Sequence, residues 1–166
     1  KLLGLWGDNY VDHGPYSEFG DLLTHRLSQF VGAGYDIPTI RNKSTTVFTN
    51  HAWGSAFRAY GSPQSFMGSE IAIDVLAAQM GMDPFDIREL NCYKESAGST
   101  IPTGYKPDVY CMEEMFKKAR PLYEAGKKRV AEKNAASDGR HTASAFPAAY
   151  TVAALTGWTP LRPMPS

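Results

Sequence analysis

The sequence predicts an α+β protein in which helices pack on short strands. In several stretches apolar residues recur at three- and four-residue steps, the spacing that places them on one face of a helix. Two other stretches, 1–11 and 35–50, are rich in apolar or β-branched residues and are bounded by turn-forming residues, as strands are. The 166 residues fit one domain, and 43% of them are hydrophobic, enough to supply a core.

Charge and composition limit the classes of partner that we expect the chain to bind. Seventeen basic and seventeen acidic residues give a net charge of zero, so no overall field attracts nucleic acid or an anionic membrane. The sequence has no apolar run of transmembrane length and no signal-peptide pattern. We therefore predict no nucleic-acid partner and no membrane association, and expect a cytoplasmic location while leaving the periplasm open. Because the first residue is Lys1 rather than Met, we also expect residues to precede it.

The first strand and helix come before residue 35. Residues 1–11 form an apolar run that predicts a strand, and 12–15 predict a turn. Asp12 beside His13 suggests an acid–base pair, but neighbouring side chains point apart, so we favour a simple turn. From Ser17, the expected N-cap, apolar residues follow helical spacing until Gly32.

The middle of the chain alternates extended and helical patterns. Residues 35–50 predict two short extended segments around a turn. A helix is expected from about 62, with Ser62 and Pro63 at its N-cap and first turn, to the stop at Gly81. Asp83 is the expected N-cap of a short helix that ends near residue 90 or 91.

The last third begins with a loop over 92–108 and a helix from Tyr110 that Pro121 could kink. The stretch 117–133 holds seven basic residues, which could contact phosphate but more often form the solvated face of a helix. Residues 134–140 resemble a linker, and 143–156 return to an alanine-rich helical pattern. Cys92 and Cys111 are too far apart for a C-x-x-C pair and too few for an iron–sulfur cluster.

The junction at 51–70 is the candidate functional stretch. It starts as an irregular segment of small residues that includes Gly54 and Gly61, and it becomes a helix. The first turn of a helix leaves N–H groups free and carries partial positive charge, which suits an anion such as a phosphate or an oxo group. The alternative is an ordinary junction that packs on the core through its aromatic residues.

Three motifs give the chain a resemblance to a known family. They are Asp12-His13-Gly14-Pro15-Tyr16-Ser17-Glu18-Phe19-Gly20-Asp21-Leu22-Leu23, Asn50-His51-Ala52-Trp53-Gly54-Ser55-Ala56-Phe57-Arg58-Ala59-Tyr60-Gly61-Ser62-Pro63-Gln64 and Gly81-Met82-Asp83-Pro84. With them the chain resembles the molybdenum-binding subunit or domain of the xanthine oxidase family, most closely the bacterial aldehyde oxidoreductases. The resemblance implies a partial molybdopterin-binding domain of a molybdenum hydroxylase.

The resemblance also implies the roles of six residues. Phe57, Arg58 and Ala59 would present backbone groups to molybdopterin, expected as the cytosine dinucleotide. A second set would line the substrate channel: Phe19, Leu22 and Tyr60, the last at a place where purine-oxidising relatives carry Phe. Such apolar walls suit a small aldehyde.

Departures from the family pattern limit what the chain can do alone. The catalytic glutamate of the family lies in a Gly-Val-Gly-Glu segment that this sequence lacks, so no catalytic residue and no direct metal ligand is assigned. Glu70 is interpreted as a structural hydrogen-bonding group instead. The [2Fe–2S] clusters are expected on other domains or chains. The isolated chain is therefore predicted to be inactive.

The resemblance divides the chain into three parts. Residues 1–125 belong to the first cofactor-binding domain, 126–140 to a linker or junction, and 141–166 to a C-terminal helix and tail. Family residues would be missing at the junction. The expected partners are the remaining segments or subunits, including the iron–sulfur domains, and a second copy of the complete enzyme.

The predicted function is part of a molybdenum hydroxylase that oxidises aldehydes to carboxylic acids with water as the oxygen source. One alternative is a hydroxylase of purines or N-heterocycles from the same family. The other is a cofactor-free remnant that serves as a structural or interaction protein.

Overall fold

The computed structural model of the chain describes residues 1–16, 18–32, 34–100, 104, 106–136 and 141–143. The elements in these ranges are β1 (Gly4–Asp12), α1 (Gly20–Phe30), β2 (Thr39–Val47), α2 (Ser62–Met80), α3 (Pro84–Asn91) and α4 (Met112–Ala135). Four helices and one small sheet confirm the predicted α+β class. Within the same ranges no helix is long and apolar enough to cross a membrane.

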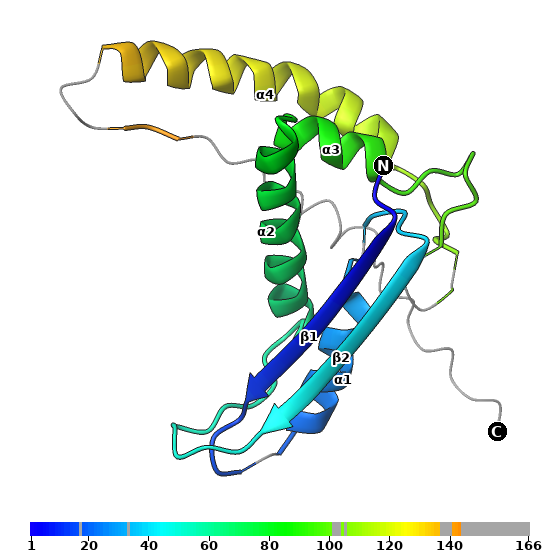
Figure 1. Cartoon of the computed structure of the whole chain (residues 1–166), viewed down its shortest axis with the longest axis vertical. Helices are drawn as coiled ribbons and strands as arrows, with labels where there is room; N and C mark the ends of the chain where they lie inside the picture. Colours follow the sequence, from blue (N-terminus) through cyan, green and yellow to red (C-terminus); the bar gives the residue numbers. More distant parts are fainter. Residues whose placement is uncertain (17, 33, 101–103, 105, 137–140, 144–166) are drawn as a thin grey trace.

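β1 and β2 lie side by side as a parallel pair, and α1 is the helix that connects them (Figure 1). The register pairs Gly4 with Thr39 and Asp12 with Val47. The prediction of two extended segments around a turn in 35–50 is wrong, because 39–47 form one continuous strand. Asn42, in the middle of this strand, accepts a 2.7 Å hydrogen bond from Asn9 Nδ2 across the two strands. This side-chain contact lets a polar residue remain within the strand.

The N-caps of two helices differ from the residues that the sequence predicted. α1 begins at Gly20 with Phe19 as its N-cap, so the prediction of Ser17 is wrong. The carboxylate of Asp21, inside the first turn, accepts from the Leu22 amide at 2.9 Å and provides a side-chain acceptor there. The N-cap of α2 is Gly61 rather than Ser62.

The predicted end of α2 and the predicted start of α3 are confirmed. Gly81 ends α2 in the left-handed conformation, with φ of 64°. Asp83 caps α3, and its side chain accepts from the Phe85 amide at 2.8 Å.

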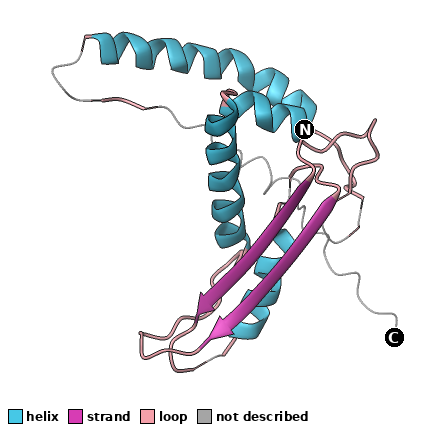
Figure 2. Ribbon diagram, viewed as in Figure 1, coloured by secondary structure: helices cyan, strands magenta, loops and turns pink. Residues whose placement is uncertain are grey.

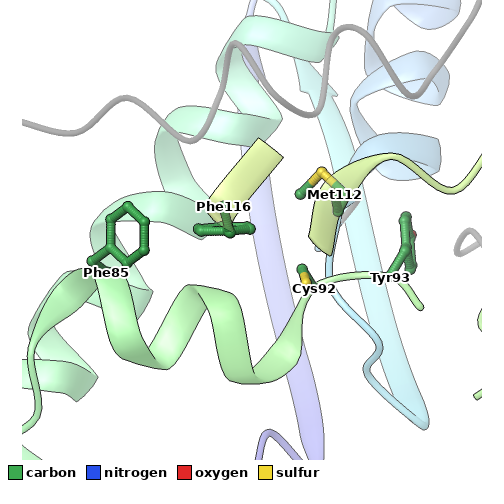
Figure 3. Close-up of a cluster of buried hydrophobic side chains, with 5 residues drawn as sticks. All are labelled: Phe85, Cys92, Tyr93, Met112 and Phe116. Carbon is green, nitrogen blue, oxygen red and sulfur yellow. The ribbon is translucent and has the colours of Figure 1, made fainter. Parts of the chain in front are cut away.

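Two buried clusters make up the core. One joins α3, the following loop and α4, and Figure 3 shows its members facing one another: Phe85, Cys92, Tyr93, Met112 and Phe116. The other joins α2, α3 and the segment before β2 through Tyr35, Ile73, Ala77 and Ile87. α1 lies on one side of the two strands (Figure 2). On the sheet's other side Trp6 and Tyr10 are exposed.

α4 extends further than the sequence predicted. It continues through Pro121 to Ala135, so most of the predicted junction 126–140 is helical. Two of its seven basic residues bind acidic residues of α3 or its cap: Arg120 pairs with Asp86 and Lys127 with Asp83. The other five are exposed, as expected for a solvated face. The predicted helix and tail at 141–166 lie outside the described residues except for 141–143.

Candidate functional site

The candidate site is built on the loop between β2 and α2, which two glycines hold in place. A Cβ atom on Gly14, at φ +69°, would lie 2.7 Å from the His51 carbonyl oxygen. A Cβ atom on Gly61, at φ +81°, would lie 2.7 Å from the Leu27 nitrogen and 2.8 Å from the Leu23 oxygen. Such distances exclude a side chain at either position. The loop is therefore held at the end of β1 and against α1.

Asp12, the last residue of β1, binds the start of this loop. Its Oδ1 accepts from the Thr49 hydroxyl at 2.6 Å and from the Gly14 amide at 2.8 Å, and its Oδ2 lies 2.5 Å from His51 Nδ1. These three contacts lower the pKa of Asp12 to about 2, with the Thr49 hydrogen bond the largest cause. Asp12 thus forms a turn and binds His51, whereas its neighbour His13 is buried. This arrangement confirms a turn at 12–15.

The loop ends in a tight turn with an unusual backbone. The Tyr60 amide donates to the Phe57 carbonyl at 2.9 Å, and the Ser62 amide donates to the Ala59 carbonyl at 3.1 Å. Ala59 has φ of 67°, the only positive φ among the described non-glycine residues. That conformation costs about 1–2 kcal/mol for an L-residue. Strain of this kind gathers at functional sites, where it fixes a conformation that function requires.

The turn presents donors that suit an anion. Phe57, Arg58 and Ala59 are exposed residues, and their amides donate no hydrogen bond within the described part of the chain. Consecutive amides beside a left-handed residue form the type of concave site that binds anions. The Arg58 guanidinium adds positive charge, and the first turn of α2 follows directly. This donor set fits a cofactor with phosphate or oxo groups.

The three predicted channel residues lie where α1 meets this turn. Phe19 is the N-cap of α1 and Leu22 lies in its first turn, with 45% and 40% of their surfaces exposed. Tyr60 is half-buried, and it directly precedes the close contact between Gly61 and α1. The Ser55 hydroxyl donates to Glu18 at 3.4 Å, which places the loop near the start of α1. The structure thus puts exposed apolar surface beside the turn, and its role as a channel wall stays a prediction.

Two contacts of the site were not predicted from the sequence. The Arg26 guanidinium lies 5.9 Å from the centre of the Tyr60 ring and 5.0 Å from that of Phe30, which orients Tyr60 against α1. Asp12 binds His51 from 39 positions away. Neither contact has a local signal in a single sequence, although Asp12 and His51 both fall within the motifs that carry the family resemblance.

Glu70 has the structural role that was predicted for it. It accepts from the Tyr35 hydroxyl at 2.5 Å and from Arg88 Nε at 2.7 Å. The Arg88 side chain is only 4% exposed and also binds Asp74 at 2.7 Å. Burial alone lowers the pKa of Arg88, but the hydrogen bond to Asp74 and the charge of Glu70 raise it above its ordinary value. The network joins α2 to α3.

A groove of about 290 Å³ lies on another side of α2, between that helix and β1. None of the six predicted site residues lines it. In the described part of the chain, no group of His, Cys, Asp and Glu side chains could hold a metal ion.

Comparison with known proteins gives a consistent result. The family model of the molybdopterin cofactor-binding domain matches residues 1–92. An aldehyde oxidoreductase of Megalodesulfovibrio gigas is 51% identical over 136 residues, which are 82% of this chain and 15% of that protein. A nicotinate dehydrogenase large molybdopterin subunit of Eubacterium barkeri is 34% identical over 104 residues, 63% of this chain and 24% of that subunit.

A solved structure of an aldehyde oxidoreductase agrees with these sequence matches. The aldehyde oxidoreductase of Desulfovibrio desulfuricans superposes with a TM-score of 0.72 and 53% sequence identity, covering 78% of this chain and 14% of that one. The chain thus spans about one seventh of the length of the aldehyde oxidoreductases it matches.

Proposed function

Because this chain belongs to the family of molybdopterin cofactor-binding domains, we propose that it forms part of a molybdenum hydroxylase of the xanthine oxidase family that oxidises aldehydes to carboxylic acids. In that reaction water supplies the added oxygen, and the aldehyde and the water molecule together release two electrons and two protons. The observation that carries the proposal is the strained, exposed turn at 57–59, whose three amides donate no hydrogen bond to any described residue and whose middle residue is Arg58.

The residues of the turn would hold the cofactor. The Phe57, Arg58 and Ala59 amides would bind its anionic groups, and Arg58 would balance their charge. When bound, molybdopterin with molybdenum supplies the oxygen-transfer and electron-accepting chemistry. We propose the cytosine dinucleotide form of the cofactor, with [2Fe–2S] clusters on other domains or chains. The fixed conformation of Ala59 would keep the donors in place before the cofactor arrives.

The residues beside the turn would select the substrate. Phe19, Leu22 and Tyr60 offer apolar surface, which favours an alkyl or aromatic aldehyde over a charged molecule. Arg26 would orient Tyr60 rather than contact the substrate, because its guanidinium lies over the Tyr60 and Phe30 rings.

The rest of the enzyme would come from outside this chain. We propose that the glutamate base and the electron path lie on other segments or subunits, that the complete enzyme is a homodimer, and that it is cytoplasmic. The isolated chain would then turn over no aldehyde.

A second candidate within the same family is a hydroxylase of N-heterocycles. The 34% identity to the large subunit of a nicotinate dehydrogenase favours it. The higher identity to an aldehyde oxidoreductase favours the aldehyde. A cofactor-free structural remnant is the remaining alternative, and the unpaired amides of the turn weigh against it.

Substrate comparison tests the proposal. The assembled native enzyme should oxidise benzaldehyde with a kcat/KM at least about tenfold above that for xanthine or nicotinate. Each polar group of xanthine or nicotinate that is buried without a hydrogen-bond partner in an apolar pocket should cost more than about 1.4 kcal/mol of transition-state binding. Preference for nicotinate or xanthine would replace the proposal with the second candidate.

The channel residues can be tested in the same assembly. Tyr60→Ala and Phe19→Ala should change the preference among aldehydes severalfold while the molybdenum content stays constant. Leu122→Ala on α4, an exposed apolar residue far along the chain, is the control and should change neither. Loss of molybdenum with an unchanged preference would contradict the assignment of Tyr60 and Phe19.

A further inference from the structure

α2 is apolar on nearly its whole circumference, although only part of it is covered. Phe66, Ile73 and Ala77 are buried against the rest of the chain. The uncovered side also carries apolar or small residues: Met67, Gly68, Ile71, Ala72, Val75 and Ala78. A helix that is apolar all round normally lies inside a protein. Within the part of the chain that the structure describes, the uncovered side of α2 therefore has no neighbour.

The groove beside this surface runs along an edge of β1. Five consecutive strand residues, 5–9, line it. Because successive side chains of a strand point to opposite faces, a cavity that touches all five must follow the backbone edge. β2 occupies the other edge, and no described residue forms a ladder with this one. The groove thus exposes backbone donors and acceptors of β1.

The α2 side of the groove leaves room for a close backbone approach. Five α2 residues line it: the four small residues Ser65, Gly68, Ser69 and Ala72, and the longer Gln64. A Cβ atom on Gly68 would meet nothing within 4 Å. The small side chains allow another backbone to lie close to α2 while it pairs with β1.

We propose that this groove receives a third β-strand, which pairs with the free edge of β1 and packs apolar side chains on α2. The strand would come from polypeptide that completes the enzyme, because the matched stretch is only 15% of the length of the M. gigas relative. An isolated two-stranded sheet is marginally stable, and a free edge is a template for strand addition. The inference rests on the larger assembly of the proposed function but not on its substrate.

The charges of the groove favour a peptide strand over the cofactor. Among the described residues that line it, Asp8 is the one charged residue, and none is Lys or Arg. An anionic cofactor would meet a like charge there, whereas a strand offers amides and apolar side chains. The cofactor and a second copy of this chain are the competing occupants that the experiment distinguishes.

Residue-resolved hydrogen exchange tests the proposal on the isolated 166-residue chain and on the native assembly purified with it. In the isolated chain, alternate amides of β1, those directed away from β2, should exchange rapidly. In the assembly these amides should become at least about tenfold more protected. Rapid exchange of the same amides in the assembly overturns the proposal, and so does full protection in the monomeric isolated chain.

The other occupants leave different traces. Protection that grows with concentration of the isolated chain would assign the groove to a second copy, and protection by added molybdopterin alone would assign it to the cofactor. Either result overturns the proposal, as does recovery of the chain without any partner from its native host. If the β1 amides are protected in an assembly that contains no molybdenum, the proposed strand pairing stands and the proposed enzyme function is refuted.

A matched pair of variants gives an independent test. Ala72→Trp places a large ring in the groove, and Ala125→Trp places the same ring on an exposed part of α4. Both should keep the helical content of the isolated chain, because both side chains are exposed. Ala72→Trp should lower the yield of assembly at least about tenfold, and Ala125→Trp should not. Equal assembly of the two variants would contradict the proposal.

Discussion

The α3–α4 end of the molecule and the sheet–loop end differ in how completely they are packed. At the first, Phe85 and Phe116 meet edge to face at 5.1 Å inside a closed cluster (Figure 3). At the second, Trp6, Trp53 and Phe57 are exposed, Phe57 to 85%. Both ends contain regular secondary structure, so they differ in how far neighbouring residues cover their apolar side chains. The closed end buries its aromatic side chains within this chain, whereas the open end leaves several of its own exposed.

The largest expected effect compares one substitution at the two ends. Phe116→Ala should lower the free energy of unfolding by about 3–5 kcal/mol, because it removes a buried ring from the cluster and leaves a cavity. Phe57→Ala should change it by less than about 0.5 kcal/mol, because that ring is already in solvent. Urea unfolding of the isolated chain measures both values. Similar losses of unfolding free energy for the two variants would contradict the difference in packing between the two ends.

The next effect concerns a tightly packed place at the open end. Gly61→Ala should cost about 3 kcal/mol, since the new Cβ atom meets backbone atoms of α1 and the positive φ adds strain. Gly98→Ala also has a positive φ but meets nothing within 4 Å, so it should cost only about 1–2 kcal/mol. Thermal unfolding of both variants compares them. An equal loss would show that α1 does not confine the turn.

The network between α2 and α3 should give a smaller loss. Glu70→Gln should lower the free energy of unfolding by about 2 kcal/mol, because it removes the charge beside a buried Arg88 that retains Asp74. Glu114→Gln, which breaks an exposed pair with Lys118, should cost less than about 0.5 kcal/mol. Chemical denaturation checks both. If Glu70→Gln loses as little unfolding free energy as Glu114→Gln, the structural role assigned to Glu70 is contradicted.

The smallest effect depends on pH and lies at the loop. The pKa of Asp12 is about 2 in the folded chain and near 3.8 without its contacts, so the Asp12 contribution is present above pH 4 and is lost as pH falls toward 2. Asp12→Asn should therefore reduce the melting temperature at pH 6, and the gap to the parent chain should close by pH 2. A gap that stays constant between these values would contradict the assigned contacts.

Local chemistry made much of the fold predictable from the sequence. Helical spacing identified the helices, and Gly81 and Asp83 marked a helix end and a helix start because their conformations and caps depend on neighbouring residues. The family resemblance singled out residues 57–59 in the motif at 50–64, but the positive φ of Ala59 was not predicted. The continuous β2 was not predictable, since Asn42 stays in the strand through a contact with Asn9, 33 positions away.

The contacts that hold the site together were beyond sequence reasoning for the same reason. Arg26 against Tyr60 and Asp12 against His51 each join residues that are distant in the chain. Such pairs depend on the parallel crossover that brings α1, β1 and the loop together, and no local pattern encodes that arrangement. The groove likewise exists only once β1 and α2 lie side by side.

Molybdenum and pterin content per chain in the native assembly, purified through a tag on this chain, tests the central claim most directly. The account predicts about one molybdenum and one pterin per copy of this chain, since the turn at 57–59 would serve one cofactor. An assembly that retains all its subunits but contains neither molybdenum nor pterin in any preparation would contradict the account.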